Sequence, residues 1–231
     1  MAEKKTKYVY FFGSGKAEGT AQMKELLGGK GANLADMTSI GLPVPPGFTI
    51  STEACAYYSS HEGAYPQGLR EQVLENLAKL ETLMGAKLGD NENPLLVSVR
   101  SGAAQSMPGM MDTILNLGLN PTSVKALIAK TNNERFAWDS YRRFMQMFGD
   151  VVMGVPHHEF ESALQDVKDS KGKSLDTELD SKDLQEVIAR YQRLYKRYTG
   201  EEFPIDPIDQ LFKSINAVFK SWNNDRAIKY R

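Results

Sequence analysis

The segment Leu95–Asn120 reads LLVSVRSGAAQSMPGMMDTILNLGLN, and it is the most informative stretch of the chain for predicting the fold. Its first residues are apolar and alternate in character, which predicts a β-strand that ends at Arg100. A loop of small residues, Ser101–Gly109, follows at once, and a second apolar segment comes after it. Because glycines and small side chains let backbone N–H groups approach an anion closely, the segment predicts one wall of a phosphate site.

A second block carries a lysine among glycines, Gly28-Gly29-Lys30-Gly31, just before a helix predicted over Asn33–Ser39. A helix N-terminus presents free N–H groups and the positive end of the helix dipole, both of which suit a phosphate. On these residues alone, a Gly-Gly turn with a solvated lysine is an equally good interpretation.

A third glycine-rich run, Gly13–Thr20, follows a strand predicted at Tyr8–Phe12. The phosphate loop of nucleotide-binding proteins needs Ser or Thr directly after its Gly-Lys pair. Here Ala17 follows Lys16, so the run is predicted to be a plain connector.

Apolar periodicity predicts several helices along the rest of the chain. They are expected at Leu69–Met84, from Pro121 after a cap at Asn120, and at Glu134–Val152, His158–Val167, Ser181–Tyr198 and Pro207–Trp222. Leu42–Ile50 and Gly200–Pro207 contain prolines and are predicted to be extended. In the aromatic stretch around Phe144, core packing is favoured over nucleic-acid stacking, and Arg142 and Arg143 are expected to face solvent or a domain interface.

Composition narrows the class of protein. The 231 residues are 41% hydrophobic and 25% charged, with a formal net charge of −1, so no global field favours nucleic acid or an anionic membrane. The one cysteine, Cys55, excludes an intrachain disulfide and suits a reducing compartment. No apolar run approaches the ~20 residues that span a bilayer, and no signal peptide is evident. A cytoplasmic location is therefore expected, and a plastid or glycosome also fits.

The wording of these motifs is similar to one family. Three segments resemble the N-terminal nucleotide-binding region of the pyruvate, phosphate dikinase family. They are LLGGKGANLADM at Leu26–Met37, GLPVPPGFTISTEAC at Gly41–Cys55, and VRSGA, which begins at Val99, followed by SMPGMMDT. The resemblance continues through RFAWDSYRRFMQMFGDVVM to AVFKSWNNDRAIKYR and covers nearly the whole chain. Phosphoenolpyruvate synthase and glucan, water dikinase are the nearer alternative, although such dikinases carry a more acidic loop after VRS.

The resemblance implies an α/β (α+β) fold, the first part of an ATP-grasp-type nucleotide-binding domain with a helical insert. The expected division is an α/β unit at 1–120, a helical insert at 121–204, and a helix at 205–231 that returns to the first unit. The resemblance also implies an enzyme that converts ATP, phosphate and pyruvate reversibly to AMP, pyrophosphate and phosphoenolpyruvate. Mg²⁺ would bridge the ATP phosphates, and histidine would carry the transferred group.

Site residues follow from the resemblance. Arg100 matches a phosphate-binding arginine essential to the nucleotide step, and Lys30 matches a lysine that contacts the phosphates. Ser106 and Gly109 belong to a loop expected to close over ATP. Further candidates around these positions are Gly29, Gly31, Ser101, Gly102 and Met110. No group of metal-ligating side chains at ligand spacing is recognised in the sequence.

None of the three histidines, His61, His157 and His158, has the threonine- and serine-flanked context of the family's phosphorylated histidine. The mobile phosphohistidine domain and the pyruvate-binding domain are therefore expected outside this chain, in a full-length homodimer. The end at Arg231 suggests that the chain is part of a longer protein. The chain alone is expected to bind ATP weakly at best and not to catalyse the dikinase reaction. A non-catalytic module that binds a partner through Glu134–Tyr198 is the alternative from another class.

Overall fold

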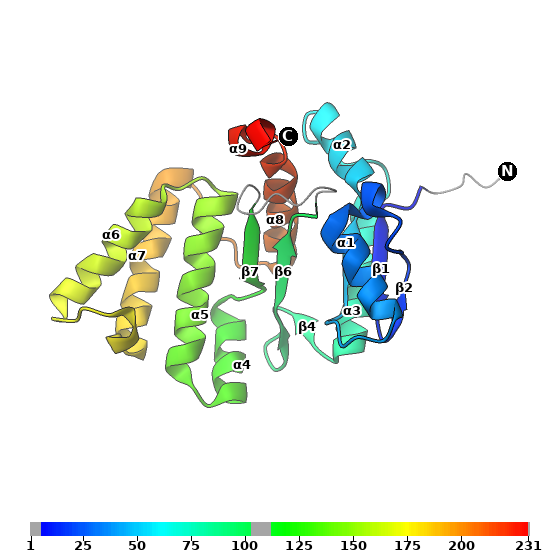
Figure 1. Cartoon of the computed structure of the whole chain (residues 1–231). Coiled ribbons are helices and arrows are strands. Elements are labelled where there is room, and N and C mark those ends of the chain that lie inside the picture. Colours follow the sequence, from blue (N-terminus) through cyan, green and yellow to red (C-terminus); the bar gives the residue numbers. More distant parts are fainter. Residues whose placement is uncertain (1–5, 103–111, 231) are drawn as a thin grey trace. The chain divides into compact units, whose positions relative to one another are not determined.

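The computed structural model describes residues 6–102 and 112–230. Helices and short strands are mixed along the chain, so the predicted α/β (α+β) class is confirmed (Figure 1). The chain divides into two compact units. Unit 1 takes in Met1–Gly85, Arg100–Asp112 and Val218–Arg231, so far as these are described, and unit 2 takes in Ala86–Val99 and Thr113–Ala217. These units do not coincide with the predicted segments 1–120, 121–204 and 205–231, which as a division into domains stay a prediction.

Unit 1 contains a three-stranded antiparallel sheet with β1 (Val9–Gly13) between β2 (Lys16–Ala17) and β3 (Gly47–Ile50). The predicted strand at Tyr8–Phe12 is thereby confirmed within a residue at each end. Ser14 and Gly15, with φ values of 51° and 73°, turn the chain between β1 and β2. Two positive φ values in succession are typical of tight hairpin turns. The glycine-rich run after β1 is therefore a hairpin connection.

The helices of unit 1 are α1 (Lys24–Ser39), α2 (Thr52–Ser60) and α3 (Leu69–Met84), and α1 and α3 both contact β1 (Figure 1). Periodicity located α3 with its bounds, although Met84, expected in the core stripe, is 47% exposed at the last position of the helix. Helix α2 was not predicted, because it is short and buries only Ala54 and Tyr58.

The strands of unit 2 form two small sheets. β4 (Lys87–Leu88) pairs in parallel with β5 (Pro94–Leu95), and β6 (Val97–Arg100) pairs with β7 (Thr113–Leu117). The single strand predicted up to Arg100 is thus interrupted at Leu96. Within β6, the valines are half-buried whereas Ser98 and Arg100 are exposed, so the expected alternation of faces is confirmed there.

The helices of unit 2 are α4 (Pro121–Thr131), α5 (Glu134–Met147), α6 (His157–Ser170), α7 (Ser181–Thr199) and most of α8 (Pro207–Ser221). A π-helical turn, Phe148–Val152, extends α5, and the short helix α9 (Asp225–Tyr230) belongs to unit 1. Helices α5, α6 and α7 run side by side (Figure 1).

The core of unit 2 gathers around Phe203, which lies in the link between α7 and α8 that was predicted to be extended. Its ring centroid lies 5.2–6.3 Å from those of four buried aromatic residues: Tyr141, Phe144, Phe148 and Tyr195. Edge-to-face contacts at such spacing stabilise a core beyond the area that they bury. The aromatic stretch around Phe144 is therefore core, as expected.

Asn120 caps α4 in the predicted manner. Its side-chain oxygen accepts hydrogen bonds from the backbone nitrogens of Thr122 at 2.9 Å and Ser123 at 2.8 Å, and the Ser123 hydroxyl accepts one from the Asn120 nitrogen. The buried Gln210 of α8 satisfies three more backbone groups, those of Gly118, Leu119 and Pro204. Since unpaired buried backbone groups are costly, these side chains fix the turn after β7.

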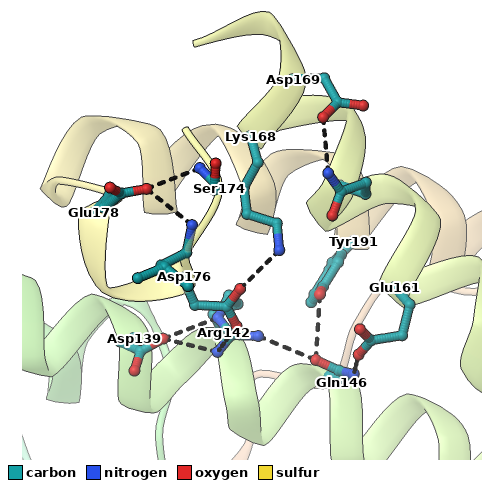
Figure 2. Close-up of polar contacts among 12 residues, drawn as sticks. Asp139, Arg142, Gln146, Glu161, Lys168, Asp169, Ser174, Asp176, Glu178 and Tyr191 are labelled. Carbon is teal, nitrogen blue, oxygen red and sulfur yellow. Dashed lines mark hydrogen bonds and ion pairs between the residues drawn. The ribbon is translucent and has the colours of Figure 1, made fainter. Parts of the chain in front are cut away.

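A polar network holds α5, α6 and α7 together (Figure 2). Arg142 of α5, only 4% exposed, donates to Asp139 at 2.9 Å and to the side-chain oxygen of Gln146 at 3.1 Å. Tyr191 of α7 donates to the same Gln146 oxygen, and the Gln146 nitrogen donates to Glu161 of α6. The expectation that Arg142 faces solvent or a domain interface is wrong, because these partners offset the cost of burying its charge.

Replacing Arg142 with Met is expected to lower the free energy of unfolding by about 3 kcal/mol, since it removes the buried guanidinium that pairs with Asp139 and donates to Gln146. Arg143→Met is the matched control, because Arg143 also pairs with Asp139 but is 64% exposed. It should change the free energy by less than about 1 kcal/mol. Urea unfolding of both variants makes the comparison, and equal losses would contradict the assignment.

Candidate functional site

Helix α1 is interrupted at Gly28, whose φ of 69° and ψ of 166° are not helical. The helix resumes directly afterwards, so Gly29, Lys30 and Gly31 occupy the first turn of its second segment. The prediction that the helix begins near Asn33 was therefore late by several residues. Glycines have a low helix propensity, and packing within the folded unit overrides it here. Lys30 consequently lies at the positive end of a helix segment.

Gly28 lies directly against the backbone of Gly102. A Cβ added to Gly28 would overlap the carbonyl group of Gly102 and lie 3.0 Å from its Cα. From the other side, a Cβ added to Gly102 would lie 3.4 Å from the carbonyl oxygen of Leu27. The segment that follows β6 is thus in contact with the break in α1, and the two sequence blocks predicted to hold phosphate come together within unit 1.

Two further contacts hold α1, the helix that carries Lys30, against other elements of unit 1. A Cβ on Gly31 would lie 2.7 Å from the Cγ2 atom of Thr49, so only glycine lets α1 approach β3 this closely. Before the break, the Thr52 hydroxyl donates a 2.6 Å hydrogen bond to the backbone oxygen of Glu25. Both sides of the break in α1 are therefore anchored.

The charges at this contact are of one sign. Burial, and then the neighbouring Arg100 guanidinium, lower the pKa of Lys30 below its ordinary value. Among the described residues, no carboxylate forms an ion pair with either cation. Because two like charges brought together repel, this arrangement suits an anion that carries several negative charges.

The remaining predicted site residues divide into two groups. Ser101 is 6% exposed and Gly102 is half-buried, both directly after Arg100 at the contact with α1. Ser106, Gly109 and Met110 lie outside the described residues, so the structure does not test the predicted lid.

The sequence does not identify Gly28 as a residue that matters to the candidate site, because its partner Gly102 lies far along the chain. A glycine pair with a lysine directly after it was the available signal, although it does not identify the partner.

The described residues with nucleophilic or metal-binding side chains do not form a second site. His157 and His158 are 61% and 79% exposed, as expected of a surface pair, and His157 lies 3.0 Å from Asp150. Burial raises the pKa of Cys55 to about 11, which keeps its thiol protonated near neutral pH. Within the described parts of the chain, no cluster of three or more His, Cys, Asp or Glu could hold a metal ion.

No helix in the described residues is both long and apolar enough to cross a membrane.

A mixed α/β fold that sets two cations beside a helix N-terminus is typical of nucleotide-binding domains. The chain matches the family model described as "Pyruvate phosphate dikinase, AMP/ATP-binding domain" over residues 24–82 and 62–231. It therefore belongs to the family of AMP/ATP-binding domains of pyruvate, phosphate dikinase, as the sequence motifs suggested.

Individual relatives agree with the family model. The chain is 59% identical over 225 residues to the chloroplastic pyruvate, phosphate dikinase of Mesembryanthemum crystallinum, covering 97% of this chain and 24% of that protein. It is 56% identical over 225 residues to the pyruvate, phosphate dikinase of Rhizobium meliloti. It is 57% identical over 225 residues to the chloroplastic pyruvate, phosphate dikinase 1 of Arabidopsis thaliana. Each match covers 97% of this chain, with 25% of the former protein and 23% of the latter. The chain thus spans about a quarter of the length of these relatives.

Arg100→Ala is expected to raise the pKa of Lys30, because loss of a neighbouring positive charge favours the protonated amine. The affinity of the chain for a polyphosphate should then persist to higher pH than in the wild type. In the wild type it should fall as pH rises through the lowered pKa of Lys30, below the ~10.4 of an ordinary lysine.

An NMR titration of the Lys30 side chain measures this shift. Arg70→Ala, which removes an exposed arginine from α3 of the same unit, is the control and should leave the pKa of Lys30 unchanged. A pKa of Lys30 that is the same with and without Arg100 would show that the two cations are not coupled.

Proposed function

We propose that this chain forms one wall of the ATP site of a pyruvate, phosphate dikinase, in which Lys30 and Arg100 bind the ATP phosphates. The whole enzyme would convert ATP, phosphate and pyruvate to AMP, pyrophosphate and phosphoenolpyruvate. The observation that carries the proposal is the contact of Gly28 with Gly102, which brings two cations together without a described carboxylate partner.

The two cations supply different chemistry. Lys30 offers a compact charge beside the helix N-terminus, which suits a single phosphate oxygen. The planar guanidinium of Arg100 can donate two parallel hydrogen bonds, and it favours the charge that spreads over phosphoryl oxygens in the transition state. Arg100 is therefore the proposed catalytic residue. Gly29, Gly31, Ser101 and Gly102 line the same contact, and Ser106, Gly109 and Met110 remain the proposed lid.

Magnesium is proposed as the cofactor, because it neutralises adjacent phosphates during transfer. The described residues offer two cations and no carboxylate cluster, so they suit the phosphate oxygens rather than the metal itself. This chain would bind and orient the triphosphate, while Mg²⁺ would arrive bound to ATP and take its protein ligands from elsewhere.

Other parts of the reaction are proposed to lie in other segments of the full-length enzyme. None of the three histidines of this chain has the threonine- and serine-flanked context of the family's phosphorylated histidine, so a mobile phosphohistidine domain is the proposed acceptor of the pyrophosphoryl group. Pyruvate and phosphoenolpyruvate would bind to a further domain. A homodimer and a cytoplasmic or plastid location are proposed from the family, without nucleic acid or a membrane as partner.

The half-reactions of the full-length enzyme separate these roles. Arg100→Ala is expected to abolish the ATP/phosphate exchange while the pyruvate/phosphoenolpyruvate exchange continues, because only the former uses the ATP phosphates. Isotope exchange with labelled phosphate or labelled pyruvate measures the two reactions. Arg143→Ala, at an exposed position of α5, is the control and should retain both. Loss of both exchanges in Arg100→Ala would indicate misfolding and contradict the assigned role.

The isolated chain offers an independent test. Calorimetric titration with ATP, with and without Mg²⁺, is expected to give weak binding and no turnover, since one wall of a site makes only part of the contacts. Full dikinase turnover by the 231-residue chain would refute the proposal.

A further inference from the structure

The break in α1 lies at Gly28, whose close backbone contact with Gly102 is not accounted for by the candidate phosphate-binding side chains. Gly28 has a φ of 69°, a backbone conformation that side chains disfavour. That alone means little, because Gly15 has a φ of 73° in an ordinary hairpin turn with nothing within 4 Å of its Cβ position. What distinguishes Gly28 is that its Cβ position is already filled by the carbonyl group of Gly102.

The contact is asymmetric. A methyl group on Gly28 would have to move the Gly102 carbonyl out to the 3.4 Å or more of an ordinary contact. A methyl group on Gly102 would already lie 3.4 Å from the Leu27 carbonyl oxygen and would fit with little movement. The closeness of the two segments therefore depends on residue 28 far more than on residue 102.

The two cations sit at equal steps from this contact. Lys30 follows Gly28 by two residues in the first turn of the resumed helix, and Arg100 precedes Gly102 by two residues. Ser101, between Arg100 and Gly102, is buried, so the backbone from Arg100 to Gly102 is packed rather than free to adjust. Any change in the spacing of the two backbones at the contact therefore changes the spacing of the two charges.

We infer that Gly28 is a positioning residue, which sets the spacing of Lys30 and Arg100 through its backbone contact with Gly102. The inference deepens the proposed ATP site and rests on it for its biological meaning. Two cations repel and would separate if they were free to do so. The contact holds them together before any anion arrives, which lowers the cost of organising the site around a triphosphate.

The test compares Gly28→Ala with Gly15→Ala in the 231-residue chain. The control adds the same methyl group at nearly the same φ in unit 1, but nothing lies within 4 Å of its Cβ position. Two quantities are measured in each variant: the pKa of Lys30 by NMR, and the affinity for inorganic tripolyphosphate by calorimetry. Circular dichroism checks that both variants are folded.

In Gly28→Ala the pKa of Lys30 should rise, because Arg100 moves away and its charge opposes protonation of the amine less. Tripolyphosphate should bind about tenfold more weakly than to Gly15→Ala, the loss expected when one of two charged contacts is misplaced. A pKa of Lys30 that is the same in Gly28→Ala and Gly15→Ala would overturn the inference.

A second variant covers the case in which Gly28→Ala does not fold. Gly102→Ile places γ carbons next to the Leu27 carbonyl and widens the same contact from the other side, so it should also raise the pKa of Lys30. An unchanged pKa there would overturn the inference. If the pKa rises but the wild-type chain does not bind tripolyphosphate, the spacing role of Gly28 stands and the proposed phosphate site fails.

Discussion

The contact between the backbones of Gly28 and Gly102 is the constraint on which the site depends. It brings a strand end that carries an arginine to a helix start that carries a lysine, with no room for a side chain between them. The proximity has a cost, since burial and then the Arg100 charge lower the pKa of Lys30. In the proposed site, folding of unit 1 would supply this energy in advance, and a bound polyanion would recover it.

The rest of unit 1 makes that constraint possible. Close packing of Gly31 on Thr49 attaches the second segment of α1 to β3, and the bond from Thr52 to the Glu25 carbonyl attaches the first segment. The break at Gly28 is therefore held from both sides, which a glycine in a free loop would not be. Rigid elements on either side of a flexible residue turn local freedom into a fixed geometry.

Features that depend on residues close together in the sequence could be predicted from it, whereas features that depend on distant partners could not. The bounds of α3 and the cap at Asn120 depend on neighbours within one or two helical turns, so periodicity and cap chemistry located them. The interruption at Leu96, the early start of α1 and the burial of Arg142 depend on partners elsewhere in the fold. Motif wording indicated that Lys30 and Arg100 serve one site, but it did not reveal the glycine contact that joins them.

Two arginines differ in burial and in pairing. Arg142 is almost fully buried, yet a carboxylate and an amide satisfy its guanidinium, so its charge is already neutralised and binds the helices together. Arg100 is exposed, has no described carboxylate partner and lies close enough to Lys30 to lower its pKa. The informative quantity is therefore charge that no described carboxylate compensates and that lies beside a close backbone contact, as Lys30 and Arg100 do where Gly28 meets Gly102.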